Sequence, residues 1–401
     1  MITVAEARAR IFRDAAPGPV ETMSLLRARG KVLAEPLTAP LSLPPFDNAA
    51  MDGFAVRASD LAPAKPEQPV RLPLSSEVTP GRAHVPPLTA GFAIRIMTGA
   101  PVPPGADAVV RLEDAYEEAG EVCFRRPVLA GENIRRMGED LQAGDRLLES
   151  GTLLTPARIA LLAGVGLCEV KVHSAPRVAI LTTGDELVQP GHVLKPGQIY
   201  DSNAFALAAM VSEAGGIPIL MGVVRDDREQ TLQQLREAAA LDVILTSGGV
   251  STGRYDLIGE TLQHHGDLHF DRVAQQPGKP FTYATLWGKP VFALPGNPVA
   301  AMICFEIYVR PVLRLMLGQQ DVERPRLMVT MAESVSKKPG KEAFLRVVLD
   351  RTPDGPLARL AGEQGSAMLS TMARANALVI VPAEAAGLAE GEQVEALALD
   401  S

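Results

Sequence analysis

The chain has 401 residues, of which 47% are hydrophobic and 21% are charged. Domains hold about 150 residues each, so this length predicts two to four domains, and the composition excludes a disordered chain. A net charge of −8 and an aromatic content of 4% also disfavour a nucleic-acid-binding protein, which needs a basic surface and stacking side chains.

The cysteines and the apolar segments predict a cytoplasmic protein. Cys123, Cys168 and Cys304 are far apart in the sequence, so we expect reduced thiols rather than a disulfide framework or a thiolate metal site. Residues 1–15 carry charges throughout, which excludes a secretory signal. Every long apolar stretch is interrupted before about 18 residues, so we expect no membrane span.

The first elements predict a helical and extended domain. Residues 3–14 have apolar side chains at helical spacing, and Thr3 and Glu6 are spaced to form an N-terminal capping box. Recurrent prolines in 32–48 favour an extended segment, because proline cannot continue a helix. A second helix is expected at 155–166. We predict one domain, discontinuous in the sequence, from residues 1–45 and 139–176.

Residues 46–138 lie between these two parts and contain short β-prone runs. Examples are FAIRIM at 92–97 and ADAVVRL at 106–112, which are separated by Gly and Pro turns. We therefore predict a β-rich insert domain over residues 46–138.

From residue 177 the chain alternates between strands and helices. RVAILTT at 177–183 is a continuous apolar run, which is typical of a strand buried on both faces of a parallel sheet. Further strands are expected at 217–224, 242–249, 268–275, 281–286 and 291–296, and helices at 203–214, 228–239, 256–264 and 298–316. The alternation predicts a central doubly wound α/β domain over 177–318, with an antiparallel hairpin at the WGKP turn of 287–290.

The remaining residues, 319–401, contain short strand-like segments separated by turn residues. These segments are RLMVTMAESV, KEAFLRVVLD, ALVIVP and EQVEALAL. We predict a small β-barrel-like domain here, so the fold class is a multi-domain chain of α/β and β domains.

Polar segments follow four of the predicted strands of the central domain. Such sheets bind ligands beyond the carboxyl ends of their strands, so we expect the four segments to converge on one crevice. They are TTGDEL at 182–187, VVRDD at 223–227, TSGGVSTGRYD at 246–256 and LPGNPVA at 294–300.

Two of these segments are candidate substrate-binding loops. The backbone N–H groups of TSGG can bind an anion, although a tight turn alone explains its glycines more simply. LPGNP begins a helix, and Asn297 is its expected N-cap. The candidate residues are Thr246, Ser247, Gly248 and Gly249 in the first loop and Pro295, Gly296, Asn297 and Pro298 in the second.

Carboxylates near these loops predict a magnesium site. Asp226 and Asp256 follow two neighbouring strands, and Glu186 follows a third. Proteins hold Mg²⁺ through such carboxylates together with the phosphate oxygens of a substrate. We predict these three residues as ligands of Mg²⁺ or a similar divalent cation, whereas Asp227 is expected to cap a helix.

Taken together, the motifs resemble one known family. The segments TTGDEL, YDSN at 200–203, TSGGVSTGRYD, QPGKP at 276–280 and LPGNPVA resemble a molybdopterin-binding domain. PPFDNAAMDGFAV at 44–56, RIMTGAPVPPGADAVV at 95–110 and ENIRRMGEDLQAG at 132–144 are similar to the rest of the molybdopterin molybdenumtransferase family. The resemblance runs from residue 3 to the end of the chain.

The resemblance implies that adenylylated molybdopterin and molybdate react, with Mg²⁺, to give molybdenum cofactor and AMP. It implies catalytic roles for Asp52, Thr98, Asp140 and Glu186. It also implies a homodimer with shared active sites, and transient contact with the adenylyltransferase and with recipient molybdoenzymes.

The resemblance further implies that Lys279 binds the substrate and that Arg346 and Ser366 bind molybdate. By pattern alone, Arg346 would be a surface charge on a strand. One departure is Gln276, where the family often has Lys, and Arg272 stands where Lys is frequent. This departure bears on the strength of anion binding more than on the reaction.

Two other functions stay open at this point. One is a molybdopterin adenylyltransferase, which shares the central domain but consists of little else. The other is a non-catalytic molybdopterin-binding scaffold. The sequence also leaves tungstate open as the anion, because it has nearly the same size and charge as molybdate.

Overall fold

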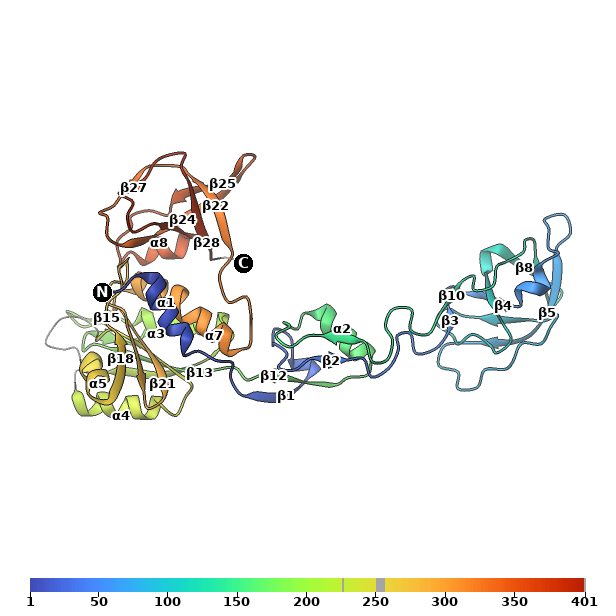
Figure 1. The fold of residues 1–401 in the computed structure, drawn as a ribbon, viewed down its shortest axis with the longest axis horizontal. Helices are drawn as coiled ribbons and strands as arrows, with labels where there is room; N and C mark the ends of the chain where they lie inside the picture. The colour runs from blue at the N-terminus through green and yellow to red at the C-terminus, as the bar shows by residue number, and fades with distance from the viewer. Residues whose placement is uncertain (226, 250–256, 400–401) are drawn as a thin grey trace. The chain divides into compact units, whose positions relative to one another are not determined.

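The structure, a computed structural model, describes residues 1–225, 227–249 and 257–399 (Figure 1). The chain divides into two compact units, one made of Met1–Glu21 and Lys171–Ser401 and the other of Thr22–Val170. In the described part of the chain, every helix is too short or too polar to cross a membrane.

The first unit contains a six-stranded sheet. Its strands are β13 (Arg177–Thr183), β16 (Ile217–Val224), β17 (Val243–Ser247), β18 (Gly266–Phe270), β20 (Thr282–Leu286) and β21 (Lys289–Leu294). Their order is β16-β13-β17-β21-β20-β18, and the first four run parallel. β20 and β21 form the antiparallel hairpin predicted at the WGKP turn. This order confirms the doubly wound α/β domain.

Helices cover both faces of this sheet, because the buried side chains of its strands alternate between two cores. In β13, Val178 and Ile180 face one core, whereas Ala179 and Leu181 face the other. The first core includes α1 (Val4–Arg13), α3 (Ser202–Glu213), α6 (Pro298–Cys304) and α7 (Arg310–Met316). The second includes α4 (Arg228–Ala238) and α5 (Leu257–His265).

Helix α1 begins with the predicted capping box. The Thr3 side chain accepts a hydrogen bond from Glu6 N at 3.1 Å, and the Glu6 carboxylate accepts one from Thr3 N at 2.8 Å. Three apolar side chains of α1 lie in the first core of the α/β sheet. The structure therefore groups residues 1–21 with the α/β domain, whereas the sequence pattern grouped them with 22–45.

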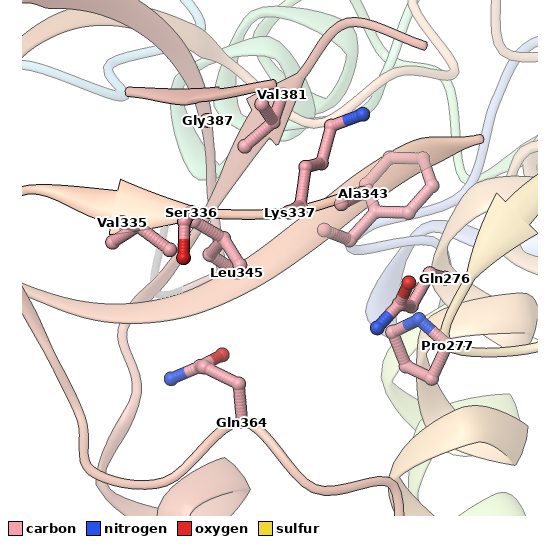
Figure 2. Close-up of a pocket in the computed structure, with 11 residues that line it drawn as sticks. Gln276, Pro277, Val335, Ser336, Lys337, Ala343, Leu345, Gln364, Val381 and Gly387 are labelled. Atoms are coloured by element: carbon pink, nitrogen blue, oxygen red, sulfur yellow. The ribbon is translucent and has the colours of Figure 1, made fainter. Parts of the chain in front are cut away.

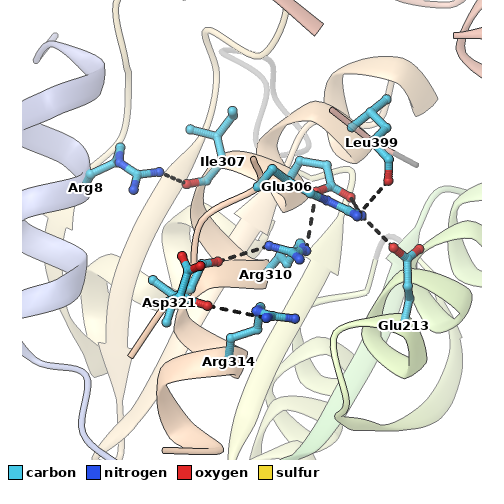
Figure 3. A network of polar contacts seen from close by, with 10 residues as sticks. Arg8, Glu213, Glu306, Ile307, Arg310, Arg314, Asp321 and Leu399 are labelled. Carbon is cyan, nitrogen blue, oxygen red and sulfur yellow. Dashed lines mark hydrogen bonds and ion pairs between the residues drawn. The ribbon is translucent and has the colours of Figure 1, made fainter. Parts of the chain in front are cut away.

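The helix predicted at 298–316 is interrupted between α6 and α7. A π-helical turn, Phe305–Val309, lies at this point, and all five of its side chains are buried. The turn directs Glu306 into a network of polar contacts with segments far away in the sequence (Figure 3).

Glu306 is the centre of this network. Its carboxylate is buried and accepts hydrogen bonds from Arg324 Nε at 3.0 Å and Nη2 at 3.2 Å. It also forms an ion pair with Arg310 Nε at 3.8 Å. Arg324 donates further to Glu213 on α3 at 2.6 Å and to Leu399 O at 2.7 Å. Burial, together with the neighbouring cation of Arg324, lowers the pKa of Arg310 to about 10.

The C-terminal part of the first unit is a closed five-stranded barrel, which confirms the predicted barrel-like domain. Its strands are β22 (Arg326–Met331), β24 (Glu342–Thr352), β25 (Gly355–Leu360), β26 (Ala377–Val381) and β28 (Gln393–Ala398). The ring closes because β24 pairs with both β25 and β26. A short strand of the α/β domain, β19 (Gln275–Gln276), pairs in parallel with β24.

The second unit contains a six-stranded sheet within the predicted β-rich insert. Its order is β7 (Ala108–Arg111), β4 (Gly53–Val56), β6 (Ala93–Ile96), β5 (Val70–Val78), β9 (Glu121–Phe124) and β8 (Ala115–Glu118). Outside the insert lies α2 (Pro156–Gly164), capped by Thr155. Short pairs are β2 (Leu37–Thr38) with β11 (Arg146–Leu148) and β3 (Asn48–Ala49) with β10 (Ile134–Arg135).

Candidate functional site

A pocket of about 810 Å³ lies beyond the carboxyl ends of β13, β17 and β21. The segments after these three strands line it, as predicted, but the fourth predicted segment, 223–227, contributes none of its described residues, and Val223 and Arg225 line a separate pocket. The lining residues predicted from the sequence are Glu186, Ser247, Gly248, Gly249, Lys279, Pro295, Gly296, Asn297 and Pro298. The structure adds Thr182, Thr183, Leu187, Ile199, Asn203, Arg272, Pro280 and Ala367.

The TSGG loop approaches the end of β13 closely. Gly248 has a φ of +90°, and a Cβ atom there would lie 2.7 Å from Thr183 Oγ1. Only glycine fits this position without displacing the neighbouring strand end. The Gly248 N–H donates to Leu294 O at 3.2 Å, so this N–H supports the sheet rather than an anion.

The Asn203 side chain holds the strand ends in place. Its amide donates to Ser247 Oγ at 2.7 Å and to Gly296 O at 2.8 Å. Ser247 in turn donates to Pro295 O at 3.2 Å. The two candidate binding loops are thus joined through one amide and one hydroxyl group.

Asp201 acts two residues earlier in the same YDSN segment. It is buried, caps α3 by accepting from Ala204 N at 3.0 Å, and accepts from Thr182 Oγ1 at 2.6 Å. Asp201 and Asn203 were named from the sequence only as part of the YDSN segment, and no role was assigned to either. The signal was present, because an Asp that precedes a predicted helix is a typical N-cap.

Asn297 is the N-cap residue of α6, as predicted, but its side chain does not cap the helix. Its side chain makes no capping hydrogen bond to α6 and instead donates to Ser366 Oγ at 3.0 Å. Ser366 belongs to the segment between β25 and β26, and the neighbouring Ala367 lines the pocket. The structure therefore brings together two predicted site residues that are far apart in the sequence. Thr246, by contrast, is fully buried and does not line the pocket.

The predicted metal ligands are described only in part. Glu186 lines the pocket and is exposed, whereas Asp226 and Asp256 lie outside the described residues. Among residues 1–225, 227–249 and 257–399, no three His, Cys, Asp or Glu side chains gather as a metal site would require. The described residues thus offer one carboxylate to a divalent cation, and no metal geometry follows from them.

Arg346 on β24 is buried, although its strand pattern alone indicates a surface charge. Its side chain has 0% exposure. Nη2 donates to Glu363 O at 2.9 Å, but Nε and Nη1 have no partner in the described part of the chain. Burial lowers the pKa of Arg346. A buried cation with two unused donors is what an oxyanion site requires.

Gln364 joins Arg346 to a second, smaller cavity. Its side chain accepts from Arg346 N at 2.9 Å and donates to Arg346 O at 3.1 Å. It also lines a cavity of about 90 Å³, together with Gln276, Ser336 and Lys337 (Figure 2). Those last three residues are shared with a larger depression of about 690 Å³, whose lining also includes Lys338 and Lys341. Three lysines therefore line the same depression as Gln276, which replaces a cation of the family pattern.

Asp52 and Thr98, both predicted to be catalytic, are in direct contact in the second unit. Asp52 Oδ1 accepts from Thr98 N and from Thr98 Oγ1, each at 2.7 Å. The backbone donor, followed by the hydroxyl donor, lowers the pKa of the Asp52 carboxyl. Asp140 is exposed in the same unit, and its backbone N–H donates to Leu43 O at 3.1 Å rather than to this pair.

We expect Thr98→Val to raise the pKa of Asp52 while leaving it below the usual range. The substitution removes the hydroxyl donor but keeps the backbone N–H, which is the larger cause of the lowered pKa. Carboxyl-carbon NMR titration measures this pKa directly. Thr89→Val, at an exposed turn of the same insert, serves as the control. An unchanged Asp52 pKa in Thr98→Val would mean that the hydroxyl does not act on this carboxylate.

Three family models match nearly the whole chain. They are the MoeA N-terminal region (domain I and II) over residues 2–166, a probable molybdopterin binding domain over 179–315 and the MoeA C-terminal region (domain IV) over 328–399. A curated relative from Mycobacterium tuberculosis, named molybdopterin molybdenumtransferase 2, is 41% identical. The aligned region covers 93% of this chain and 94% of the relative's length. The chain belongs to the molybdopterin molybdenumtransferase family.

Further comparisons confirm this family of enzymes and its fold. A molybdopterin molybdenumtransferase from Haemophilus influenzae is 34% identical over 98% of both chains. The crystal structure of a molybdopterin biosynthesis MoeA protein from Pyrococcus horikosii superposes with a TM-score of 0.88 and 34% identity, and covers 100% of both chains. Within this molybdopterin molybdenumtransferase fold, the pocket at the strand ends lies in the segment that matches the probable molybdopterin binding domain.

Proposed function

We propose that this chain inserts molybdate into adenylylated molybdopterin, with cleavage of the phosphoanhydride and release of AMP. Relatives named molybdopterin molybdenumtransferase support the reaction class. The observation that carries the proposal is Arg346, a fully buried cation whose Nε and Nη1 have no partner among the described residues. A tetrahedral dianion would supply both the missing charge and the missing acceptors.

The pocket residues would bind the pterin nucleotide and orient its phosphates. Lys279 and Arg272 are the cations of its lining, and Ser247 and Asn203 supply polar contacts at the strand ends. Cleavage of a phosphoanhydride depends mainly on positioning and on neutralising developing charge. The residues present suit that task without a protein nucleophile.

The proposal includes Mg²⁺ held by Asp226, Asp256 and Glu186. Bound there, the cation would neutralise charge on the phosphate oxygens. We expect chelation of divalent ions to abolish AMP release and added Mg²⁺ to restore it, as measured by chromatography of the nucleotide. Full AMP release after exhaustive chelation would remove the metal from the proposal.

We also propose that the protein acts in the cytoplasm as a homodimer with shared active sites. Transient partners would be the adenylyltransferase that makes the pterin nucleotide and the molybdoenzymes that accept the finished cofactor. Direct transfer between these proteins would limit loss of the pterin nucleotide.

Incubation of the purified protein with adenylylated molybdopterin and molybdate tests the function. AMP and molybdenum cofactor are expected in equal amounts, and a control with ATP in place of the pterin nucleotide is expected to show no consumption. Consumption of ATP with free molybdopterin would instead indicate the adenylyltransferase. Binding of the pterin without turnover would indicate a scaffold.

We expect Arg346→Met to raise the molybdate concentration needed for half-maximal rate by about tenfold or more. A hydrogen bond to a charged group contributes about 1.5–3 kcal/mol, and each 1.4 kcal/mol is about tenfold in affinity. Molybdate is also expected to raise the melting temperature of the wild type but not of the variant.

Arg359→Met is the matched control, because Arg359 pairs with Asp350 on the exposed side of the barrel. It should leave the molybdate dependence unchanged. Gln276→Lys is expected to lower the molybdate requirement, since it adds the cation that the family pattern has. If Arg346→Met keeps the wild-type molybdate dependence, the anion binds elsewhere.

A further inference from the structure

Residues 275–280 form a loop that lies between two cavities. Lys279 and Pro280 line the 810 Å³ pocket at the strand ends, and Gln276 and Pro277 line the 90 Å³ cavity beside the barrel. Since one short loop contributes to both cavities, the position of its backbone determines the positions of Lys279 in one cavity and Gln276 in the other.

The buried side chain of Gln275, which has 0% exposure, holds the loop on the side that faces the helix of Cys304. Its amide nitrogen donates to Pro277 O at 3.0 Å and to Cys304 Sγ at 3.2 Å. Its amide oxygen accepts a hydrogen bond from the Tyr308 hydroxyl. The side chain of Gln275 therefore connects the loop backbone to the buried helix that contains Cys304 and Tyr308.

The loop packs closely against Gln275 and Cys304, with no space for a side chain between them. Gly278 has a φ of +96°, and a Cβ atom there would meet the Gln275 amide and would lie 2.5 Å from Cys304 Sγ. The loop therefore cannot move toward the helix, and the hydrogen bond from Gln275 to Pro277 O opposes movement away from it.

The same loop is attached to the strand that carries the buried arginine. β19 pairs in parallel with β24, with Gln275 opposite Glu342 and Gln276 opposite Ala343. Arg346 lies farther along β24. Gln275 is therefore the point where the loop, the helix and the strand of the anion site are joined.

We propose that Gln275 and Tyr308 are positioning residues, which act through the 275–280 loop to place Lys279 against the anionic substrate. This inference rests on the proposed function. An apolar pair would fill the same volume, but a satisfied buried polar pair fixes one geometry, because any shift leaves a donor or acceptor unpaired.

The test compares four variants in steady-state kinetics and in thermal unfolding. Tyr308→Phe and Gln275→Leu each break the network and leave a buried polar group unpaired. The double variant replaces both partners with apolar groups. Tyr283→Phe is the matched control, because it removes a hydroxyl from the same core without touching the loop.

Each single variant is expected to raise the KM for adenylylated molybdopterin by about fivefold or more, with kcat within about twofold of wild type. In the double variant the melting temperature should recover toward wild type, whereas the KM should stay raised, because Pro277 O still lacks its donor. Tyr283→Phe should keep the wild-type KM.

A KM that recovers together with the melting temperature would overturn the proposal, since the network would then serve folding alone. So would single variants that lose only kcat. If neither the wild type nor Tyr283→Phe releases AMP, the proposed function fails instead. Equilibrium binding of adenylylated molybdopterin, followed by fluorescence, then tests the positioning by itself, and equal affinities of Tyr308→Phe and wild type would refute it.

Discussion

A random mixture of the Asp52→Ala and Lys279→Ala variants is expected to recover about a quarter of wild-type activity, although each variant alone should lose about 99% of it or more. Asp52 belongs to the second unit, and Lys279 belongs to the first. If each active site takes Asp52 from one subunit and Lys279 from the other, a mixed dimer has one intact site out of two. Random mixing makes about half of all dimers mixed, which gives the quarter.

The alternative arrangement predicts a different result. If each site takes both residues from one chain, every site in the mixture carries one lesion and no activity returns. The subunits are mixed under mild denaturation and the mixed species is verified by two affinity tags. Mixing wild type with the double variant Asp52→Ala, Lys279→Ala is the control. A verified but inactive mixed dimer would refute the shared-site proposal.

We expect Glu306→Gln to lower the free energy of unfolding of the first unit by about 3–5 kcal/mol, because breaking a buried ion pair from one side leaves the other charge uncompensated. Arg310 and Arg324 would both lose their buried counter-charge. Gln keeps the shape of Glu, so the loss would reflect charge rather than packing. Urea unfolding followed by circular dichroism measures the change.

Glu213→Gln is the matched control for this prediction. Glu213 pairs with the same Arg324, but its side chain is 59% exposed. Exposed ion pairs contribute less than about 1 kcal/mol, so this variant should unfold close to wild type. If both variants lose equal stability, burial does not set the strength of the network.

Much of the fold could be predicted because local pattern and tertiary structure agree. The apolar run of β13, the hairpin at 287–290 and the capping box of α1 all match their sequence signals. β25 and α8 (Leu369–Arg374) were not predicted. Their sequences are short and lack a clear period. β25 is stabilised by packing with β24, and α8 by packing against the core of the α/β domain.

The candidate site was predictable to a lesser degree. The glycine-rich strand ends identified the pocket, because chain geometry dictates glycine there. The N-cap position of Asn297 was predicted correctly, but its side chain donates to Ser366 rather than capping its own helix, which the sequence does not show. The burial of Arg346 could not be predicted from the sequence of its strand either, since Arg346 packs against a distant segment that includes Glu363. Both cases depend on contacts between distant segments.

The position of α1 bears on how the chain folds during synthesis. This helix leaves the ribosome well before its binding surface, because Arg8 donates to Ile307 O and Arg10 to His269 O. The apolar face of the helix therefore stays exposed while more than 250 intervening residues are translated. Domains generally complete folding in order from the N-terminus, but here α1 joins a core whose other parts follow residues 22–170 in the chain. Its ten residues, rich in charge outside the apolar face, suit a segment that has to stay soluble during that interval.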